Sequence, residues 1–430
     1  MDTTIGAADS SILITLAIPM FFLLVFIELV YGLATGKNNY RLNDAFTSMS
    51  LGLISRFVPL LGIGFQGAAY AYVANYYNLT LLSSSSIIVW IFAFLLYDLC
   101  YYWMHRLHHE VKVFWATHVV HHHGEEFNMS TAMRQTSTGF LWKWIFYLPV
   151  FIVGIPPEVF VSVAGVNLVY QFWVHTEHIP KLGWYEKIFV SPSNHRVHHA
   201  QNKDYVDANY GGVFILWDRF FGTYKAEKEE LKPIYGTSKP LKSWNPFKAN
   251  LDIFSEMLFD STKTKSFRDK IKVWFSSPKW RPADVEKEYP VFKNDLDNFE
   301  PYNPDTSSKV KIYGWVQMIF LLSASASITA TLLSQTYLET SIFAFTLIIS
   351  CTIALMALEK FDLKILPELI KSLTVLFVFS FSSLIDPGLL VTKLFIAQSL
   401  INICLVLSLY YLPSKLISSP FKSSSATYVF

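Results

Sequence analysis

The twelve histidines of this 430-residue chain are the side chains whose type and spacing could do chemistry. All of them lie between His105 and His199, and most stand three or four positions from another histidine. Residues at that spacing share one face of a helix, so each group can aim two or three imidazoles at one point. The spaced groups are His105 with His109, His118 with His121 and His122, His175 with His178, and His195 with His198 and His199.

Metal binding is the clearest use for so many converging imidazoles. Neutral imidazole binds iron, zinc, copper and nickel well, whereas the same rings without a metal would oppose one another's protonation. A single tetrahedral zinc takes about four ligands and would leave half of the set unused, but two ions at about four ligands each would use it. The pattern therefore predicts a two-metal site. It leaves open whether His108, His123 or His178 is a ligand or an ordinary polar residue.

A redox reaction suits such a site better than hydrolysis or transport. Metal-assisted hydrolysis needs only one or two metals that activate a water, and rarely this many histidines. A pair of irons can bind and split dioxygen and attack an unactivated C–H bond. A transporter would place ionisable residues along its membrane spans, whereas here the histidines gather in one part of the chain. A non-enzymatic metal-handling membrane protein is therefore the less favoured alternative.

The elements that must position these rings are membrane helices. Hydrophobic residues make up 52% of the chain and charged residues 16%, whereas an average soluble domain has about 25% charged residues. This composition argues against a soluble globular, a disordered or a nucleic-acid-binding protein. A helix of about 20 apolar residues crosses a bilayer. The predicted spans are residues 12–35, 48–75, 81–103, 312–334, 341–358, 365–384 and 389–411, and residues 140–153 and 159–174 are expected to form a hairpin that enters the membrane and turns back.

The distribution of lysine and arginine predicts the orientation of these helices. If the N-terminus lies outside, the outer loops contain neither residue and the opposite loops hold them, with Lys393 near the end of the last span as the one departure. This positive-inside pattern places every histidine on the cytoplasmic side. The expected fold class is therefore all-α, a polytopic membrane helical bundle with a histidine-rich two-metal site at the cytoplasmic face. A bacterial inner membrane and the endoplasmic reticulum suit it equally.

Composition also divides the chain into three expected parts. Residues 1–224 combine membrane helices with the histidine groups, and residues 312–430 form a C-terminal membrane bundle without histidine. Between them, residues 225–311 are polar and rich in proline, which breaks long helices. We expect this segment to be an extended cytoplasmic connector with one or two short helices.

The order of the histidine groups resembles a known family. One His-x3-His group at His105 and two His-x2-His-His groups, beginning at His118 and His195, are similar to the histidine boxes of the fatty acid hydroxylase/sterol desaturase superfamily of membrane di-iron enzymes. The resemblance covers about residues 90–224. Within it, residues 172–177 and 192–199 are most similar to the alkylglycerol monooxygenases. Matching flanks are Tyr97-Asp98, Tyr101-Tyr102-Trp103, Phe127-Asn128, Asn209-Tyr210-Gly211-Gly212 and Trp217-Asp218.

The resemblance implies a di-iron monooxygenase that uses dioxygen and an external electron donor. It would hydroxylate the carbon next to the ether oxygen of a glyceryl lipid taken from the bilayer, and the product would collapse to an aldehyde and a free glycerol. In that family the reductant is tetrahydrobiopterin, but no residue here identifies a pterin pocket. Hydroxylation or desaturation of a fatty acyl chain, a sterol or a carotenoid on the same site is the alternative. The implied ligands of the two iron ions are His105, His109, His118, His121, His122, His175, His195, His198 and His199.

Other polar residues near the histidine groups are candidates for supporting roles. A metal-bound imidazole usually donates its other N–H to a carboxylate or a carbonyl. Glu110 is the first candidate because it adjoins His109, and the others are Glu125, Glu126, Glu177, Asp207 and Asp218. Asn128, Arg134 and Asn209 are expected to orient the site or to bind the polar head of the substrate.

Overall fold

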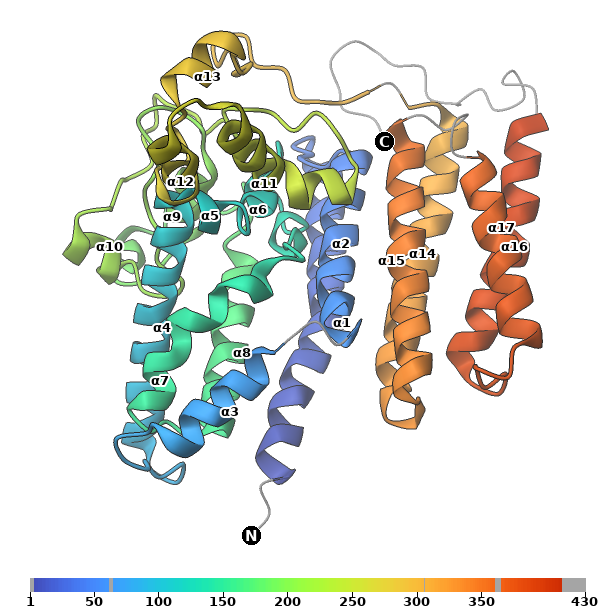
Figure 1. Ribbon diagram of the computed structural model, residues 1–430, viewed down its shortest axis with the longest axis horizontal. Helices are drawn as coiled ribbons and strands as arrows, with labels where there is room; N and C mark the ends of the chain where they lie inside the picture. Colours follow the sequence, from blue (N-terminus) through green and yellow to red (C-terminus); the bar gives the residue numbers. More distant parts are fainter. Residues whose placement is uncertain (1–3, 62–64, 305, 360–364, 412–430) are drawn as a thin grey trace. The chain divides into compact units, whose positions relative to one another are not determined.

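The computed structural model describes residues 4–61, 65–304, 306–359 and 365–411, and these residues are helical without any β-strand (Figure 1). Two isolated β-bridges join Phe189 to Phe214 and Ala200 to Tyr235. The predicted all-α fold class is therefore confirmed for the described part of the chain. Residues 412–430, the end of the expected C-terminal bundle, lie outside the described residues.

The chain forms two compact units. The first comprises residues 1–40, 65–241 and 250–300, and it contains every histidine. The second comprises residues 41–64, 242–249 and 301–430. The expected three-part division at residues 224 and 311 stays a prediction, while this grouping shows which segments pack together.

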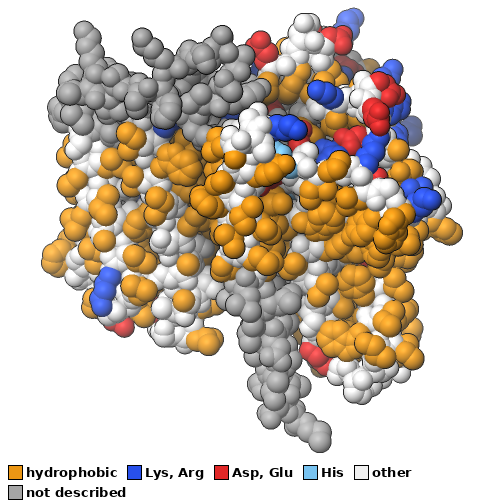
Figure 2. Space-filling view, turned by 180° about the vertical axis from the view of Figure 1, so that it is seen from behind, with side chains coloured by type: hydrophobic (Ala, Val, Ile, Leu, Met, Phe, Trp, Pro, Cys, Tyr) orange, Lys and Arg blue, Asp and Glu red, His pale blue; other side chains and the backbone are white. Residues whose placement is uncertain are grey.

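Four helices among the described residues are long and apolar enough to cross a membrane. They are α4 (Ile87–Glu110) in the first unit and α14 (Ser308–Ala330), α15 (Tyr337–Glu359) and α17 (Leu390–Tyr411) in the second. On the face seen in Figure 2, hydrophobic side chains cover much of the outside of the described helices. These helices make the chain an integral membrane protein.

Some predicted spans take another form. Residues 12–35 belong to the 32-residue helix α1 (Thr4–Thr35), whereas α16 (Ile365–Phe381) has 17 residues and is shorter than a full span. Residues 48–75 are not one helix but α2 (Leu42–Phe57), the 3-10 turn η1 (Val58–Leu61) and α3 (Gln66–Tyr76). Residues 62–64, between η1 and α3, lie outside the described residues.

The predicted hairpin of residues 140–174 is present as a series of short helices followed by a long one. The short helices are η3 (Gly139–Leu141), η4 (Lys143–Tyr147) and α7 (Leu148–Ile152), and the long one is α8 (Pro157–Trp173). Gly154 makes the turn between them with a φ of +89°. A Cβ atom there would lie 1.8 Å from the carbonyl oxygen of Thr80, so only glycine fits.

The helices of the first unit pack around α8. Both α1 and α4 contact α8, and buried residues such as Ala93, Val159 and Val163 fill the space beside it. Short helices follow near the Glu110 end of α4 (Figure 1). They are α5 (Lys112–Trp115), α6 (Val119–His122) and α9 (Pro192–His199), and α10 (Leu216–Phe221) lies beside α4.

The proline-rich connector is more ordered than the sequence indicated. It forms three helices, α11 (Pro246–Lys263), α12 (Phe267–Phe275) and α13 (Ala283–Glu288), and α12 packs against α5. The expectation of an extended segment was wrong because its prolines fall where they do not break a helix. Pro246 is the first residue of α11 and Pro282 caps α13, and proline is tolerated in the first helical turn.

The second unit is a bundle of α2, α14, α15, α16 and α17. Its core is apolar around Phe343, Leu347 and Phe395. A buried polar network lies within it: Glu368 accepts hydrogen bonds from Lys371 (2.6 Å), Asn402 (2.7 Å) and Tyr313 (3.1 Å).

Candidate metal centre

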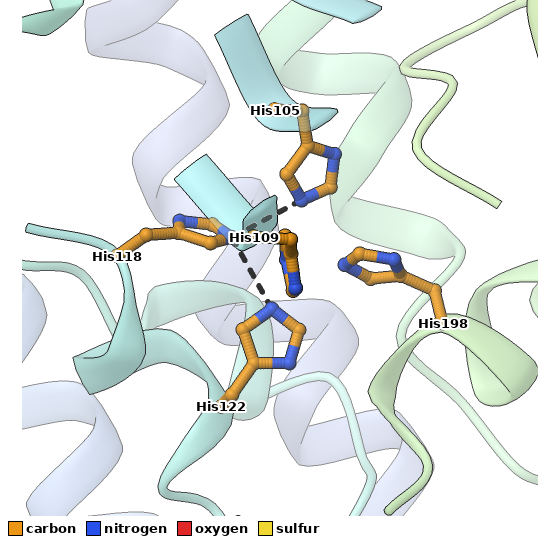
Figure 3. Close-up of side chains that lie close together, drawn as sticks. All are labelled: His105, His109, His118, His122 and His198. Atoms are coloured by element: carbon orange, nitrogen blue, oxygen red, sulfur yellow. Dashed lines mark hydrogen bonds between the residues drawn. The ribbon is translucent and has the colours of Figure 1, made fainter. Parts of the chain in front are cut away.

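Nine histidine side chains from four parts of the first unit come together in two clusters. In each cluster, one ring nitrogen from every member lies within 4.8 Å of the others. The first cluster is His105, His109, His118, His122 and His198 (Figure 3). The second cluster is His121, His175, His195 and His199. The structure thus brings together all nine residues that were predicted as ligands.

The His-x2-His-His groups are divided between the clusters. His118 and His122 point into the first cluster while His121 points into the second, and His195 and His199 point into the second while His198 points into the first. The expectation that each group aims at one point was wrong. Successive residues of a helix turn by about 100°, so positions i+3 and i+4 fall on opposite sides of position i. Each group therefore serves both clusters.

Imidazole rings of the two clusters pack directly against each other. The ring centroids of His122 and His199 are 4.4 Å apart and nearly parallel, with 23° between the planes. The centroids of His198 in the first cluster and His195 in the second are 5.3 Å apart, with 17° between the ring planes. Two cations held by these clusters would therefore be neighbours in one centre.

Ring nitrogens approach one another closely inside each cluster. In the first, the Nε2 atom of His118 lies 3.1 Å from that of His105 and 3.2 Å from that of His122. In the second, the Nε2 atom of His195 lies 2.9 Å from that of His175 and 3.1 Å from that of His199. Two nitrogens that bind one ion at right angles, each about 2.1 Å from it, are about 3 Å apart.

Backbone carbonyls orient four of the rings. The Nδ1 atoms of His105 and His198 donate to the carbonyls of Tyr210 (2.9 Å) and Ala208 (3.0 Å). Those of His121 and His175 donate to Arg134 (3.0 Å) and Gln171 (2.9 Å). A neutral imidazole whose Nδ1 carries the proton has a free lone pair on Nε2. These carbonyls therefore fix the tautomer that a metal needs.

The donor set fits metal ions. The buried nitrogens His109 Nε2 and His198 Nε2 have no hydrogen-bond partner among the described residues. A buried polar atom of this kind is costly unless something binds it. Since the rings supply only nitrogen, the candidates are iron, zinc, copper and nickel rather than magnesium or calcium.

Burial keeps these rings neutral. Removal from water lowers the pKa of His118, His121 and His122 well below the ordinary value of 6.5, and the other histidines lower it further. The same desolvation lowers the pKa of His175 to about 3 and that of His198 to about 4. At neutral pH the rings therefore offer lone pairs to a metal, with no proton to displace.

Glu110 lies at the edge of the site rather than against a ring. Its carboxylate pairs with Arg106 (2.9 Å) and its side chain is 40% exposed. Arg106 also donates to the hydroxyl of Tyr102 (3.3 Å), which is 2.9 Å from the hydroxyl of Thr223. Thr223 in turn donates to Asp218 (2.7 Å). This position does not support a direct hydrogen bond from Glu110 to a metal-bound imidazole.

The three polar residues expected to orient the site are buried and hold backbone segments. The Asn128 side chain donates to the carbonyl of Asn39 (2.7 Å). Arg134 Nε donates to the carbonyl of Val120 (3.0 Å), next to the second histidine group. Asn209 donates to the carbonyl of Asn194 (3.0 Å) at the start of α9. Their contacts support an orienting role, and binding of a substrate head group stays a prediction.

The other predicted carboxylates differ in their surroundings. Asp218 is fully buried and accepts from the backbone N–H groups of Tyr210 (2.7 Å) and Gly211 (2.8 Å). Asp218 therefore fixes the carbonyl of Tyr210 that orients His105. Glu177 accepts from the hydroxyl of Tyr235 (2.9 Å), and Asp207 pairs with Lys279 at the surface. Roles for Glu125 and Glu126 stay predictions.

Three histidines belong to neither cluster. The Nδ1 atom of His108 donates to the carbonyl of Met104 (2.6 Å) within α4. The ring of His178 lies edge-on to Tyr31, with centroids 5.1 Å apart. His123 follows α6, and its backbone N–H donates to Val119 (3.0 Å). The geometry therefore favours the non-ligand interpretation for all three.

Two buried acids of the apolar helices support the site and were missed from the sequence. Asp98 in α4 accepts from the backbone of Val213 (2.9 Å) and Phe214 (3.0 Å), so it holds the segment after Tyr210. Glu28 in α1 accepts from the backbone of Met129 (2.7 Å) and from the hydroxyl of Thr176, beside His175. The signal that could have found them is a single acid in an otherwise apolar run.

Comparisons with known proteins agree with the site. Residues 90–223 match the family model of fatty acid hydroxylases. The chain is 37% identical to the alkylglycerol monooxygenase of Xenopus tropicalis over 304 residues, which is 70% of this chain and 68% of that protein. It is 38% identical to the alkylglycerol monooxygenase of Homo sapiens over 312 residues, 71% of this chain and 69% of that protein. No solved structure matches the chain.

More distant relatives match a shorter stretch of the chain. A Delta(7)-sterol 5(6)-desaturase of Gibberella zeae is 28% identical over 151 residues, 32% of this chain and 42% of that protein. An ornithine lipid hydroxylase of Rhizobium tropici is 28% identical over 124 residues, 29% of this chain and 38% of that protein. These relatives support a lipid-modifying oxidoreductase in the membrane. The chain has the two histidine clusters and is similar to the alkylglycerol monooxygenases over about 70% of its length. It therefore belongs to the alkylglycerol monooxygenases within the fatty acid hydroxylase family.

Proposed function

We propose that this protein is a membrane di-iron monooxygenase that hydroxylates and cleaves glyceryl ether lipids. The observation that carries the proposal is the pair of adjoining clusters of five and four buried imidazoles. The similarity to alkylglycerol monooxygenases extends well beyond these rings, to 70% of the chain, and it supports the ether lipid as substrate.

The chain's own residues prepare the centre for two iron ions. The first cluster would hold one ion and the second cluster the other. When bound, the pair supplies the activation of dioxygen and the attack on a C–H bond. The carbonyls of Tyr210 and Arg134 keep the Nδ1 protons of His105 and His121 away from the ions. Phe127 packs over His199 (5.2 Å between ring centroids) and Tyr235 (4.9 Å), and it excludes water from the second cluster.

The reaction balances with one dioxygen and two electrons. One oxygen atom enters the C–H bond next to the ether oxygen, and the other leaves as water with two protons and two electrons. The hydroxylated carbon is then a hemiacetal, which breaks its bond to the glycerol oxygen and leaves a fatty aldehyde and glycerol. We propose a tetrahydropterin as the external electron donor, which is what the family resemblance of the histidine groups implies. We also propose that the centre faces the cytoplasm, because the order of the spans predicted from the sequence assigns the Lys- and Arg-bearing loops and the histidines to the same side.

A direct assay tests this function. The full-length protein, purified in lipid nanodiscs and loaded with iron, is incubated with an alkylglycerol, dioxygen and reduced tetrahydrobiopterin. We expect fatty aldehyde and glycerol in equal amounts. The matched control is the same protein with an ester-linked monoacylglycerol, which has no ether carbon to hydroxylate. Absence of aldehyde from the alkylglycerol would reject the ether-lipid activity.

The second candidate function is hydroxylation or desaturation of another lipid on the same centre. It is favoured by the partial similarity of the chain to a sterol desaturase and an ornithine lipid hydroxylase. A product assay with fatty acyl, sterol and carotenoid substrates distinguishes it, because the second function gives a hydroxylated or desaturated product without aldehyde. A non-enzymatic metal-handling protein would give neither product and would hold labile zinc or copper.

A further inference from the structure

An apolar shelf stands beside α4 on the surface of the first unit. It consists of η5 (Gly183–Lys187), Ile188 and α10 (Leu216–Phe221). The two segments are bound together: the backbone N–H of Ile215 donates to the carbonyl of Ile188 (3.0 Å), and Arg219 donates to the carbonyl of Glu186 (3.1 Å). The shelf is therefore one surface, although its parts are about thirty positions apart in the chain.

The shelf exposes large apolar side chains that nothing in the chain's described part covers. Phe220 is 80% exposed, Trp184 69%, Leu216 43% and Ile188 38%. Exposed apolar side chains that gather on one surface mark an interaction site, because isolated ones are ordinary but groups are not. Aromatic residues of this kind collect where a protein meets the boundary between lipid and water.

Contacts with α4 fix the depth of the shelf. Two pairs join α4 to α10: Asp98 with the indole N–H of Trp217 (3.0 Å), and Trp103 with Phe221 (ring centroids 4.9 Å apart). A third pair, Phe94 with Phe214 (5.9 Å), joins α4 to the segment just before α10. These α4 residues extend over about 13 Å of a helix that rises about 1.5 Å per residue. In Figure 1, α10 accordingly lies beside α4 and not beyond its end.

The apolar face of α4 continues onto the shelf. Ile88, Ile91 and Leu95 are exposed along this spanning helix, and Trp103 is exposed where the helix meets Phe221. The lipid that surrounds α4 therefore reaches the shelf without an intervening polar surface. A segment at this depth must satisfy backbone hydrogen bonds within the protein, and the helical turns of η5 and α10 provide part of them.

The exposed charges at the shelf are positive. Lys181 precedes η5 and Lys187 is its last residue, and Arg219 extends from α10 over the ring of Tyr224 (3.8 Å). The acid of η5, Glu186, instead faces the protein, where it accepts from the backbone of Leu182 (2.9 Å) and the hydroxyl of Ser191 (2.7 Å). Long basic side chains can keep their charges at the phosphate level while their stems lie against acyl chains.

From these contacts we propose that the shelf is immersed in the lipid leaflet at the histidine-bearing end of α4. Its rings contact acyl chains, and its basic residues bind lipid phosphates. The shelf also carries Asp218, which holds the backbone of Tyr210 and through it the ring of His105. Immersion of the shelf therefore sets the depth of the first cluster in the leaflet. This inference does not depend on the proposed reaction.

Site-directed spin labelling tests the inference. A nitroxide is attached to cysteine in Phe220→Cys, Leu216→Cys or Trp184→Cys, each with the exposed Cys404 replaced by serine. The full chain is reconstituted in vesicles of phosphatidylcholine and phosphatidylglycerol. Power saturation then measures collision with oxygen, which concentrates in lipid, and with a water-soluble nickel chelate. Ile91→Cys on α4 is the lipid-exposed control, and Lys203→Cys on an exposed loop is the water-exposed control.

We expect the oxygen-to-nickel collision ratio at all three shelf positions to match that of Ile91→Cys. A ratio like that of Lys203→Cys at Phe220 and Trp184 would overturn the inference. Three positions are used so that the test survives if one variant does not fold, which size-exclusion chromatography reveals. The measurement needs neither iron nor substrate, so its failure is distinguishable from failure of the proposed reaction.

Discussion

The Nε2 atoms of His121 and His175 face each other at 3.3 Å, while the Nδ1 atom of each ring donates to a backbone carbonyl. Both Nε2 atoms therefore carry lone pairs, and two lone pairs at this distance repel unless a cation lies between the rings. This relationship ties the fold to metal binding more directly than the number of histidines does. It predicts that the second cluster is completed by an ion.

Removal of one ring from each cluster should reveal two separate ions. We expect about two irons per chain in the parent protein, from nine rings at about four ligands per ion. His121→Ala leaves three rings in the second cluster, and His198→Ala leaves four in the first. His121→Ala should therefore lose one iron more completely than His198→Ala does. Elemental analysis of purified protein measures both.

His178→Ala is the matched control for these variants. His178 is a histidine of the same unit, but it belongs to neither cluster and packs on Tyr31. We expect its iron content to equal that of the parent protein. Equal iron loss in all three variants would contradict the assignment of rings to clusters.

Asp218→Ala should affect the first cluster selectively. The substitution leaves the buried N–H groups of Tyr210 and Gly211 without their acceptor, at a cost of about 1–3 kcal/mol for each in the free energy of unfolding. The carbonyl of Tyr210 then orients His105 less well, and loss of such a partner typically weakens metal affinity about 10–100-fold. Iron titration should therefore show one weakened site and one unchanged site.

Asp204→Ala is the control for Asp218→Ala. Asp204 pairs with Lys228 at the surface, so its loss should change neither the iron titration nor the melting temperature. If Asp218→Ala weakened both ions equally, Asp218 would support the unit as a whole and not the ring of His105.

The nine rings could be predicted from the sequence because the order and spacing of the histidine groups resemble the histidine boxes of a known family, whereas spacing alone left His108, His123 and His178 open. The sequence could not predict how the rings divide. His118 caps α6, a helix of only four residues. Whether His121 and His122 point into the same cluster depends on the angle between their side chains around that single turn. The ring partners could not be predicted either. Tyr210 is 105 positions from His105 in the chain. Ala208, the partner of His198, lies in a loop whose course has no sequence signal.

The supporting acids show the same limit. Glu110 was the first candidate because it adjoins His109 in sequence. In α4, however, the Glu110 carboxylate accepts a hydrogen bond from Arg106. Asp98 is seven positions from His105 and was not predicted to act, yet it anchors the backbone of Val213 and Phe214. Gly212 allows this approach, because a Cβ atom there would lie 2.8 Å from the Asp98 carboxylate. Such long-range packing leaves no periodic pattern in a sequence.

Iron should stay bound below the pH at which ordinary histidines release metal. Burial lowers the pKa of His118, His195 and His199 well below 6.5 and that of His198 to about 4. Because the folded rings resist protonation, few protons compete with the metal as the pH falls through 6.5. We expect the iron content after dialysis to be the same at neutral pH and one unit below 6.5. A loss of bound iron on acidification with its midpoint at pH 6.5 would contradict this expectation.

The buried ion pair of the second unit provides a stability test that does not involve the histidines. Glu368→Leu leaves the ammonium of Lys371 buried without its carboxylate, and breaking such a pair costs about 3–5 kcal/mol in the free energy of unfolding. Lys371→Met costs less, because Asn402 and Tyr313 still donate to Glu368. The double variant should be more stable than Glu368→Leu alone, since it removes the stranded charge. Thermal unfolding in detergent measures the cycle, and additive effects of the two substitutions would show that the pair is not coupled.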